Sequence, residues 1–286
     1  MRAFLLTTIV LIICCTPLFA TESFEKIDQL MENKKYEEAI SLLETIIEQN
    51  DENAPAYFKL GTCWFFLEDY DEAVDAFDEA VELEGTNAEY YLWLGNALGR
   101  KTRDASIFKQ PFLAPKIKDA YERSVELDPT LVDARIGLIQ FNLQAPGIMG
   151  GDTDEARLHI EKLIEMGELQ GKFLLASYYN QEDKPDSAMI VYDSLEREIG
   201  NDPDYFNFYN QYGYMLLNQK RYDDAIEKFE KQVELAPDRA NSYDSLGDGY
   251  RAAGRKEEAI TAYKKAVEID PGFAPSKKNL EELQGE

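Results

Sequence analysis

The chain repeats one pattern of apolar positions at helical spacing, and residues 240–271 show it most clearly. A first predicted helix presents one apolar face, made of Tyr243, Leu246, Gly247 and Tyr250. After a break at Gly254, a second presents Ala259, Tyr263 and Ala266 and ends at Pro271. Apolar residues at this spacing predict two amphipathic helices that pack against each other.

The same pattern recurs in register along the chain, with weaker matches at the N-terminal end and in the centre. The predicted units are 20–53, 54–87, 88–131, 132–168, 169–205, 206–239 and 240–273, followed by a capping helix at 274–286. No stretch alternates with period two, so no sheet is expected. We therefore predict an all-α fold in which residues 21–286 form a single solenoid with one continuous core.

The spacing of aromatic, Leu-Gly, aromatic, Ala, aromatic, Ala and Pro resembles the tetratricopeptide repeat family. Other units carry it as Tyr57, Leu60-Gly61 and Phe77, and as Tyr209, Tyr212-Gly213 and Phe229. The resemblance implies a right-handed superhelix of about seven helix-turn-helix repeats. It also implies that the first helix of each repeat lines a concave groove that binds a peptide or helical segment of another protein.

Carried over residue by residue, the resemblance places sixteen candidate binding positions in this groove. They are Phe58, Thr62, Phe65, Phe66, Leu92, Asn96, Gln140, Asn180, Asn207, Asn210, Tyr214, Asn218, Asn241, Asp244, Asp248 and Arg251.

These positions differ in character between the two ends of the chain. The phenylalanines at 58, 65 and 66 can hold an apolar anchor, or Phe65 and Phe66 can pack against the degenerate first repeat or its flank instead. The amides near the C-terminal end can both donate to and accept from an extended backbone. Family members that clamp a carboxylate use cations in this groove; Asn96 fits that pattern, but Leu92, Asn207 and Asn210 do not.

Two central segments are longer than the repeat requires. Arg100–Pro115 is cationic in an acidic chain and carries Phe108 and Phe112, and 145–152 is rich in glycine. We expect both to be loops. They leave two alternatives to a binding scaffold: an enzyme or accessory subunit whose site lies in these loops and uses Asp152 or His159, and a homo-oligomer whose contact is 107–113.

The first twenty residues have the order of a secretory signal peptide. A basic start, an apolar run and Ala20 before polar residues predict export to a periplasm or the extracellular space, with no membrane span after cleavage. A retained N-terminal anchor and a lipoprotein, through Cys14 or Cys15, are alternatives. Cleavage would leave Cys63 as the only cysteine of the mature chain, which excludes a disulfide-linked fold.

The formal net charge of −25 disfavours a nucleic-acid partner. It suits solubility or a partner that is basic as well as apolar. We expect no cofactor, no metal and no catalytic residue, because the single histidine, His159, has no second ligand at metal-binding spacing. The acids that begin the second helices recur from repeat to repeat and complement helix dipoles.

Overall fold

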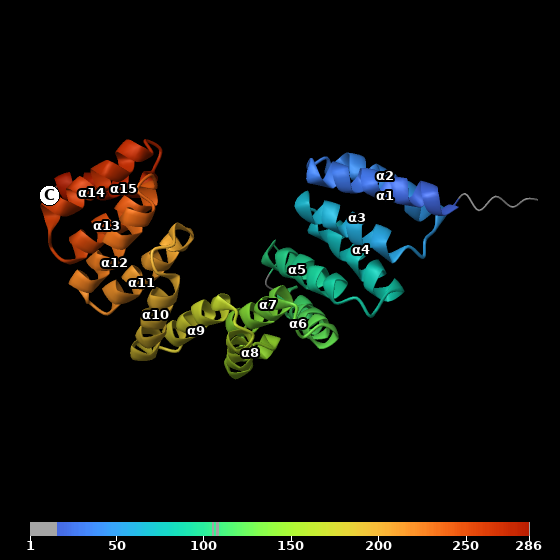
Figure 1. Cartoon of the computed structure of the whole chain (residues 1–286), viewed down its shortest axis with the longest axis horizontal. Helices are drawn as coiled ribbons and strands as arrows, with labels where there is room; N and C mark the ends of the chain where they lie inside the picture. The colour runs from blue at the N-terminus through green and yellow to red at the C-terminus, as the bar shows by residue number, and fades with distance from the viewer. Residues whose placement is uncertain (1–15, 105, 107–108, 286) are drawn as a thin grey trace, which may run out of the picture. The chain divides into compact units, whose positions relative to one another are not determined.

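The computed structural model describes residues 16–104, 106 and 109–285, and these residues form α-helices and short 3-10 turns without any strand (Figure 1). The helical repeat fold is therefore confirmed. The predicted signal at 1–20 lies largely outside the described residues, and the first helix, α1, begins at Thr16. Among the helices described, none has the length and apolar character that a membrane span needs.

The chain divides into two compact units, 1–159 and 160–286, which we call the N-terminal and C-terminal units. The boundary falls inside one helix, α8, so the division is not at a linker. The sequence shows no boundary here, and a single continuous solenoid stays a prediction. Each unit is described by itself below.

Helices of the N-terminal unit follow one another along the chain, and from the first to the seventh each helix packs against the next. They are α1 (Thr16–Glu32), α2 (Tyr36–Gln49), α3 (Ala54–Phe66), α4 (Tyr70–Leu83), α5 (Ala88–Asp104), α6 (Gln110–Leu127), α7 (Val132–Gln144), the 3-10 turn η1 (Gly147–Met149) and α8 (Thr153–Glu165), which crosses the boundary.

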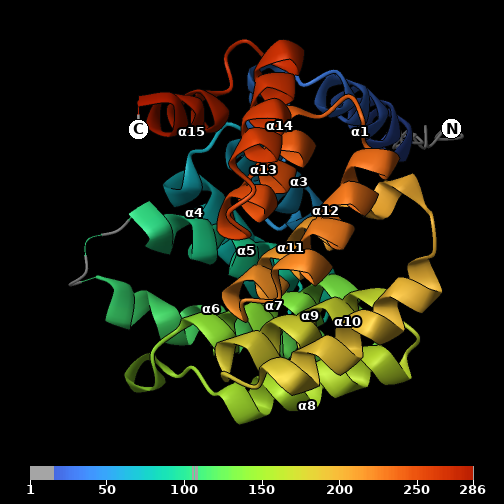
Figure 2. The same cartoon turned by 90° about the vertical axis from the view of Figure 1, so that its left-hand side faces the viewer.

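The C-terminal unit continues the same arrangement, and Figure 2 views its helices from the side. They are α9 (Leu169–Gln181), α10 (Pro185–Ile199), the 3-10 turn η2 (Pro203–Tyr205), α11 (Phe206–Asn218), α12 (Tyr222–Leu235), α13 (Ala240–Ala252), α14 (Lys256–Ile269) and α15 (Ala274–Gly285). The last helix packs on α14 and buries its own Leu283 against Tyr263, as a capping helix does.

Several hairpins turn through one residue in the left-handed backbone region. Lys34, Glu68 and Lys220 have φ near +60°, and Gly254 has φ of +74° at the matching place. The next N–H returns to the helix that has just ended, as Lys35 N does to Leu30 O at 2.8 Å. This geometry satisfies terminal carbonyls and reverses the chain within a few residues.

In four helix pairs, the first helix presents a glycine to an aromatic ring of the second where the two helices cross. In α5 and α6 this pair is Gly95 and Tyr121: a Cβ at 95 would lie 2.8 Å from the ring. Gly61 with Phe77, Gly213 with Phe229 and Gly247 with Tyr263 repeat the arrangement. The fully buried rings and the alanines beside them form the core of each unit.

The predicted loop at 100–115 is wrong over most of its length. The extra residues instead lengthen α5 to Asp104 and start α6 at Gln110. The added turn of α5 is held by α4, because Arg100 donates to the Tyr70 hydroxyl at 2.6 Å and Lys101 pairs with Asp71 at 2.6 Å. Pro111 lies in the first turn of α6, where a missing N–H costs nothing.

Candidate functional site

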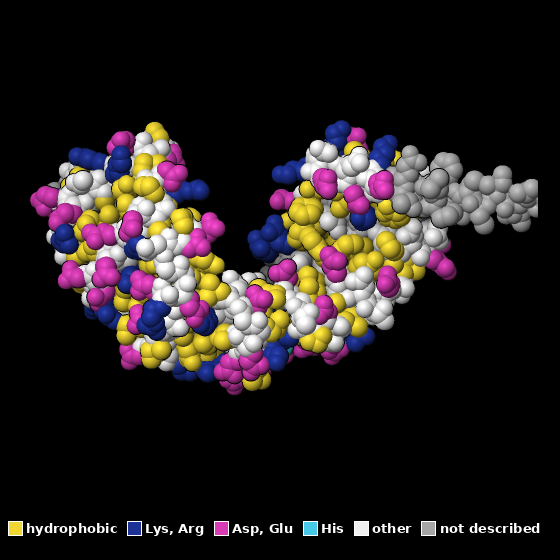
Figure 3. All heavy atoms as spheres, in the orientation of Figure 1, with side chains coloured by type: hydrophobic (Ala, Val, Ile, Leu, Met, Phe, Trp, Pro, Cys, Tyr) yellow, Lys and Arg dark blue, Asp and Glu magenta, His cyan; other side chains and the backbone are white. Residues whose placement is uncertain are grey.

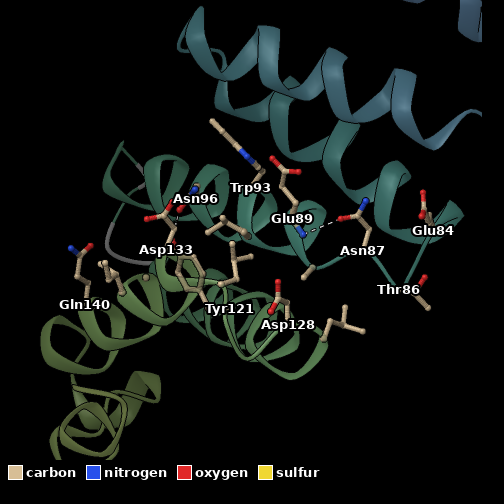
Figure 4. A pocket seen from close by; sticks show the side chains of 16 residues that line it. Glu84, Thr86, Asn87, Glu89, Trp93, Asn96, Tyr121, Asp128, Asp133 and Gln140 are labelled. Carbon is tan, nitrogen blue, oxygen red and sulfur yellow. Dashed lines mark hydrogen bonds between the residues drawn. The ribbon is translucent and has the colours of Figure 1, made fainter. Parts of the chain in front are cut away.

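A continuous groove runs along α5 and α7, both first helices of their pairs. It consists of two adjoining hollows of about 910 and 500 Å³ that share Asn96, Tyr121, Gly137 and Gln140. We call it the α5–α7 groove. Figure 4 shows its larger half, with Glu84 and Asp128 at one end, Trp93 and Tyr121 between, and Gln140 at the other end.

Tyr121 forms the floor of the groove and is held on both sides by glycine. A Cβ at Gly137 would lie 2.4 Å from the ring, and one at Gly95 2.8 Å. The Tyr121 hydroxyl donates to Asn96 Oδ1 at 2.9 Å, and burial raises the pKa of Tyr121 to about 12, so it remains a donor. With its oxygen engaged, the Asn96 amide presents its N–H groups as donors.

The two ends of the α5–α7 groove carry opposite charges. Glu84, Glu89, Asp128 and Asp133 line the half near the N-terminal ends of α5 and α7. The other half, near the C-terminal ends, has Arg100 and Arg103 together with amides. The groove therefore combines apolar and amide side chains in its middle with separated charges at its ends, which is a suitable surface for an extended or helical segment of protein.

Aromatic rings form the wall of the groove on its α3 side. Phe65 meets Trp93 edge-on at 5.3 Å between centroids, and Phe66 stacks on Tyr36 at 5.4 Å. Phe66 nevertheless remains 51% exposed. Figure 3 shows hydrophobic side chains gathered over this part of the N-terminal unit, beside lysine and arginine side chains. Phe66 therefore packs on Tyr36 of the first repeat, whereas Phe58 stacks on Tyr90 of α5, in the third repeat, at 4.7 Å.

The C-terminal unit has a separate hollow of about 560 Å³ between α9, α10 and α11, which we call the amide groove. Asn180, Asn210 and Asn218 line it as the sequence places them, together with Gln211 and Gln219. Asn180 donates to the Tyr192 hydroxyl at 3.2 Å, which leaves its oxygen to accept. Asn207 and Asn241 are exposed but do not line this hollow.

Three of the sixteen positions are buried: Thr62, Leu92 and Asp244. The Thr62 hydroxyl bonds to the Phe58 carbonyl within its own helix, and Leu92 belongs to the core cluster around Phe77 while it also lines the larger hollow of the α5–α7 groove. Asp244 accepts from the Ser276 hydroxyl of α15 at 2.6 Å. Side chains at these places stabilise the packing of neighbouring helices.

Four further predicted positions, Asn210, Tyr214, Asp248 and Arg251, form hydrogen bonds or ion pairs with neighbouring helices. Tyr214 donates to Asp248 at 2.7 Å, and Asn210 accepts from Ser245 at 2.7 Å. Arg251 binds α15 through Glu282 at 2.9 Å. These bonds join α11, α13 and α15 in one polar network of the C-terminal unit, and Asn210 and Tyr214 also line the amide groove.

Trp93, Tyr121 and Gly137 are groove residues that the repeat pattern did not single out. The pattern assigns position 121 to the core of its own pair and does not say that its hydroxyl reaches Asn96. The sequence did contain one signal for this arrangement: α5 and α7, the first helices of neighbouring pairs, each carry a glycine, at 95 and 137, that faces the Tyr121 ring.

Asp152 and His159, the residues named for the alternative enzyme site, both make contacts that stabilise the fold. Asp152 accepts from the backbone N–H of Asp154 and Glu155 and so begins α8. His159 Nδ1 lies 3.0 Å from Arg135, and burial lowers the His159 pKa. The described residues include no group of three or more His, Cys, Asp or Glu side chains that could hold a metal ion.

The proposed self-association contact is only partly visible. Ile107 and Phe108 lie outside the described residues, whereas Phe112 is 78% exposed on α6 and Ile148 is 94% exposed on η1.

Cys63 is a buried free thiol whose pKa burial raises to about 12, so it is unreactive as a nucleophile.

Comparison with protein families gives matches in both units. Tetratricopeptide repeat models match residues 30–98 and 204–271. A tetratricopeptide repeat protein from Parabacteroides merdae has a similar structure, with a TM-score of 0.67 at 17% identity, covering 92% of this chain and 98% of that one. The C-terminal part of a repeat protein from Cytophaga hutchinsonii gives 0.64 at 19%, covering 90% and 99%. No curated protein matches the chain.

Proposed function

Because the chain belongs to the tetratricopeptide repeat family, whose fold suggests a protein-protein interaction scaffold, we propose that it binds a segment of another protein without catalysing a reaction. The observation that carries the proposal is the α5–α7 groove. Its floor is fixed by Tyr121 between two glycines, and its walls offer apolar rings, amide donors and separated charges. A preformed groove binds a segment without first ordering itself.

The amide groove supports a second contact region for the same kind of partner. Amides donate and accept, so they bind the backbone of an extended segment with little dependence on its side chains. Asn218 and Gln211 have no side-chain hydrogen bond to any residue in the described part of the chain. Their capacity is therefore available to a ligand backbone.

We propose that the protein acts after export, in the bacterial cell envelope or outside the cell. The proposal rests on the order of residues 1–20, which is that of a secretory signal. N-terminal sequencing of the protein purified from its native cells tests it. A chain that starts at Thr21 supports cleavage, whereas a chain that starts at Met1 and remains in the cytoplasm contradicts export.

The binding role is tested by capturing partners on the immobilised full chain and then titrating the identified partner against variants. We expect the triple variant Asn180→Ala, Gln211→Ala and Asn218→Ala to weaken binding about tenfold or more, since each exposed amide contributes one or two hydrogen bonds. The matched control replaces Gln49, Asn201 and Gln284, exposed amides that line neither groove. Equal affinity of both triple variants would contradict the amide groove as a binding site.

A further inference from the structure

Charge is separated along α5 in a way that no other first helix of the described chain repeats. Glu89 lies in its first turn, and Lys101 and Arg103 lie in its last. Helices α3, α9 and α11 have neither, whereas α7 has only an acid and α13 only a base. The α5–α7 groove follows this helix, so a bound segment would contact acids at one end and arginines at the other.

The acidic end is not neutralised by the protein itself. Glu84, Glu89 and Asp133 form no ion pair with any residue that the structure describes. At Asp128, the hydroxyl and backbone N–H of Thr130 hold the pKa of the carboxyl below its ordinary value. Four carboxylates around one hollow attract a cationic group by their combined field.

The opposite end differs in how firmly its charges are held. Arg100 is fixed by the Tyr70 hydroxyl and lies over the Tyr70 ring at 5.1 Å. Arg103 is exposed and has no ion pair among the described residues. Arg103 is therefore the cation that can turn toward a ligand.

Between these ends the groove is apolar along one wall and polar at its floor. Trp93 and Ile136 line the larger hollow, and Asn96 presents amide donors because its oxygen accepts from Tyr121. A segment placed here can bury an aliphatic side chain against Trp93 and accept from Asn96 through a backbone carbonyl.

We propose that the α5–α7 groove selects a charge-polarised segment of its partner protein, with lysine or arginine at one end, aliphatic residues in the middle and carboxylates at the other end. The inference rests on the proposed binding function and names the chemistry of the ligand. Stabilisation of helix ends explains acids in the first turns of α5 and α7. It does not explain Glu84 and Asp128, which lie at the ends of α4 and α6 and face the same hollow.

Fluorescence anisotropy with synthetic peptides on the full chain tests the proposal. One labelled peptide has paired lysines, a leucine-containing middle and paired glutamates; a second has lysines at both ends. The variants are Glu89→Lys with Asp133→Lys, and Arg103→Glu. A control double variant, Glu37→Lys with Asp154→Lys, makes the same charge change in the first turns of α2 and α8, outside both grooves.

We expect the pair at 89 and 133 to weaken both peptides about tenfold or more, because like charges would meet at the acidic end. Arg103→Glu should weaken the polarised peptide and strengthen the one with lysines at both ends. The inference is overturned if Arg103→Glu changes both peptides in the same direction, or if the control variant weakens binding as much as the groove variant does.

The peptide result also separates this inference from the binding function itself. If neither peptide binds while a captured partner still depends on Asn180, Gln211 and Asn218, the charge-polarised ligand is wrong and the scaffold function stands. If the captured partner is insensitive to both sets of variants, both proposals fail.

Discussion

Gly137 is the residue on which the geometry of the α5–α7 groove depends most closely. It leaves room for the Tyr121 ring, whose hydroxyl in turn orients Asn96. Gly99, on α5 and in the same groove, has open space within 4 Å of the place that a Cβ would take. Both glycines therefore lie inside a helix, but only Gly137 is in close contact with a side chain of another helix.

We expect Gly137→Ala to destabilise the chain by about 1–3 kcal/mol, because the added methyl must displace a buried ring. Gly99→Ala should be neutral or stabilising by up to ~1 kcal/mol, since alanine favours a helix over glycine. Urea unfolding of both variants measures the difference. Equal effects at the two positions would contradict the close contact of Tyr121 with α7.

Gln232 is a fully buried glutamine, and neither its side-chain oxygen nor its nitrogen has a hydrogen-bond partner among the described residues. Methionine has a similar shape and carries no strong polar group, so Gln232→Met should raise the free energy of unfolding by about 1–3 kcal/mol. Gln170→Met, at an exposed position of α9, is the control and should change little. A loss of stability on Gln232→Met would mean that a bound water or another group satisfies the amide.

Helix α8 is attached to α7 through a histidine that must stay neutral. Burial and the nearby charge of Arg135 lower the His159 pKa below its ordinary value of 6.5. Glu155, 3.8 Å away, opposes this effect but is paired with Lys118 at 2.6 Å. Because the unfolded chain binds the proton more readily, this contribution to stability is complete above pH 6.5 and is lost as pH falls through the folded pKa.

We expect His159→Gln to reduce the pH dependence of unfolding between about pH 7.5 and the folded pKa, since glutamine can still accept from Arg135 but does not titrate. Thermal melts across this range, compared with the parent chain, measure the change. Parallel curves for the two proteins would contradict a depressed histidine pKa.

Element positions follow from the sequence more fully than the site does. The first helices begin at Ala54, Ala88 and Val132 because apolar spacing and breakers repeat locally. Length changes at 100–115 escaped this reasoning, since the two prolines of this segment indicate a loop, whereas Pro111 lies in the first turn of α6 and α4 supplies partners for Arg100 and Lys101 of the longer α5. Groove residues were harder to predict because burial at Asp244 depends on Ser276, a residue of another element.

At the scale of the molecule, the two compact units offer a test of cooperativity. Both tryptophans, Trp64 and Trp93, lie in the N-terminal unit, so fluorescence follows that unit, whereas circular dichroism follows all the helices. Neighbouring repeats can unfold together or as separate groups.

We expect Gly137→Ala to shift the fluorescence midpoint in urea, and Gln232→Met to leave it nearly unchanged while raising the midpoint of a second transition in circular dichroism. The residues changed lie in different units. A fluorescence midpoint that follows both substitutions equally would show a single cooperative solenoid instead.

The central claim is that a segment of another protein lies in the α5–α7 groove. The most direct measurement is the yield of photo-crosslinked partner, in native cells, from a photoreactive residue placed at Gln140, compared with one at Leu158, which is exposed on α8 and lines neither groove. We predict one discrete adduct from position 140, lost on combination with Glu89→Lys and Asp133→Lys, and none from position 158. Equal yields from the two positions, or an adduct unaffected by those charge reversals, would contradict the account.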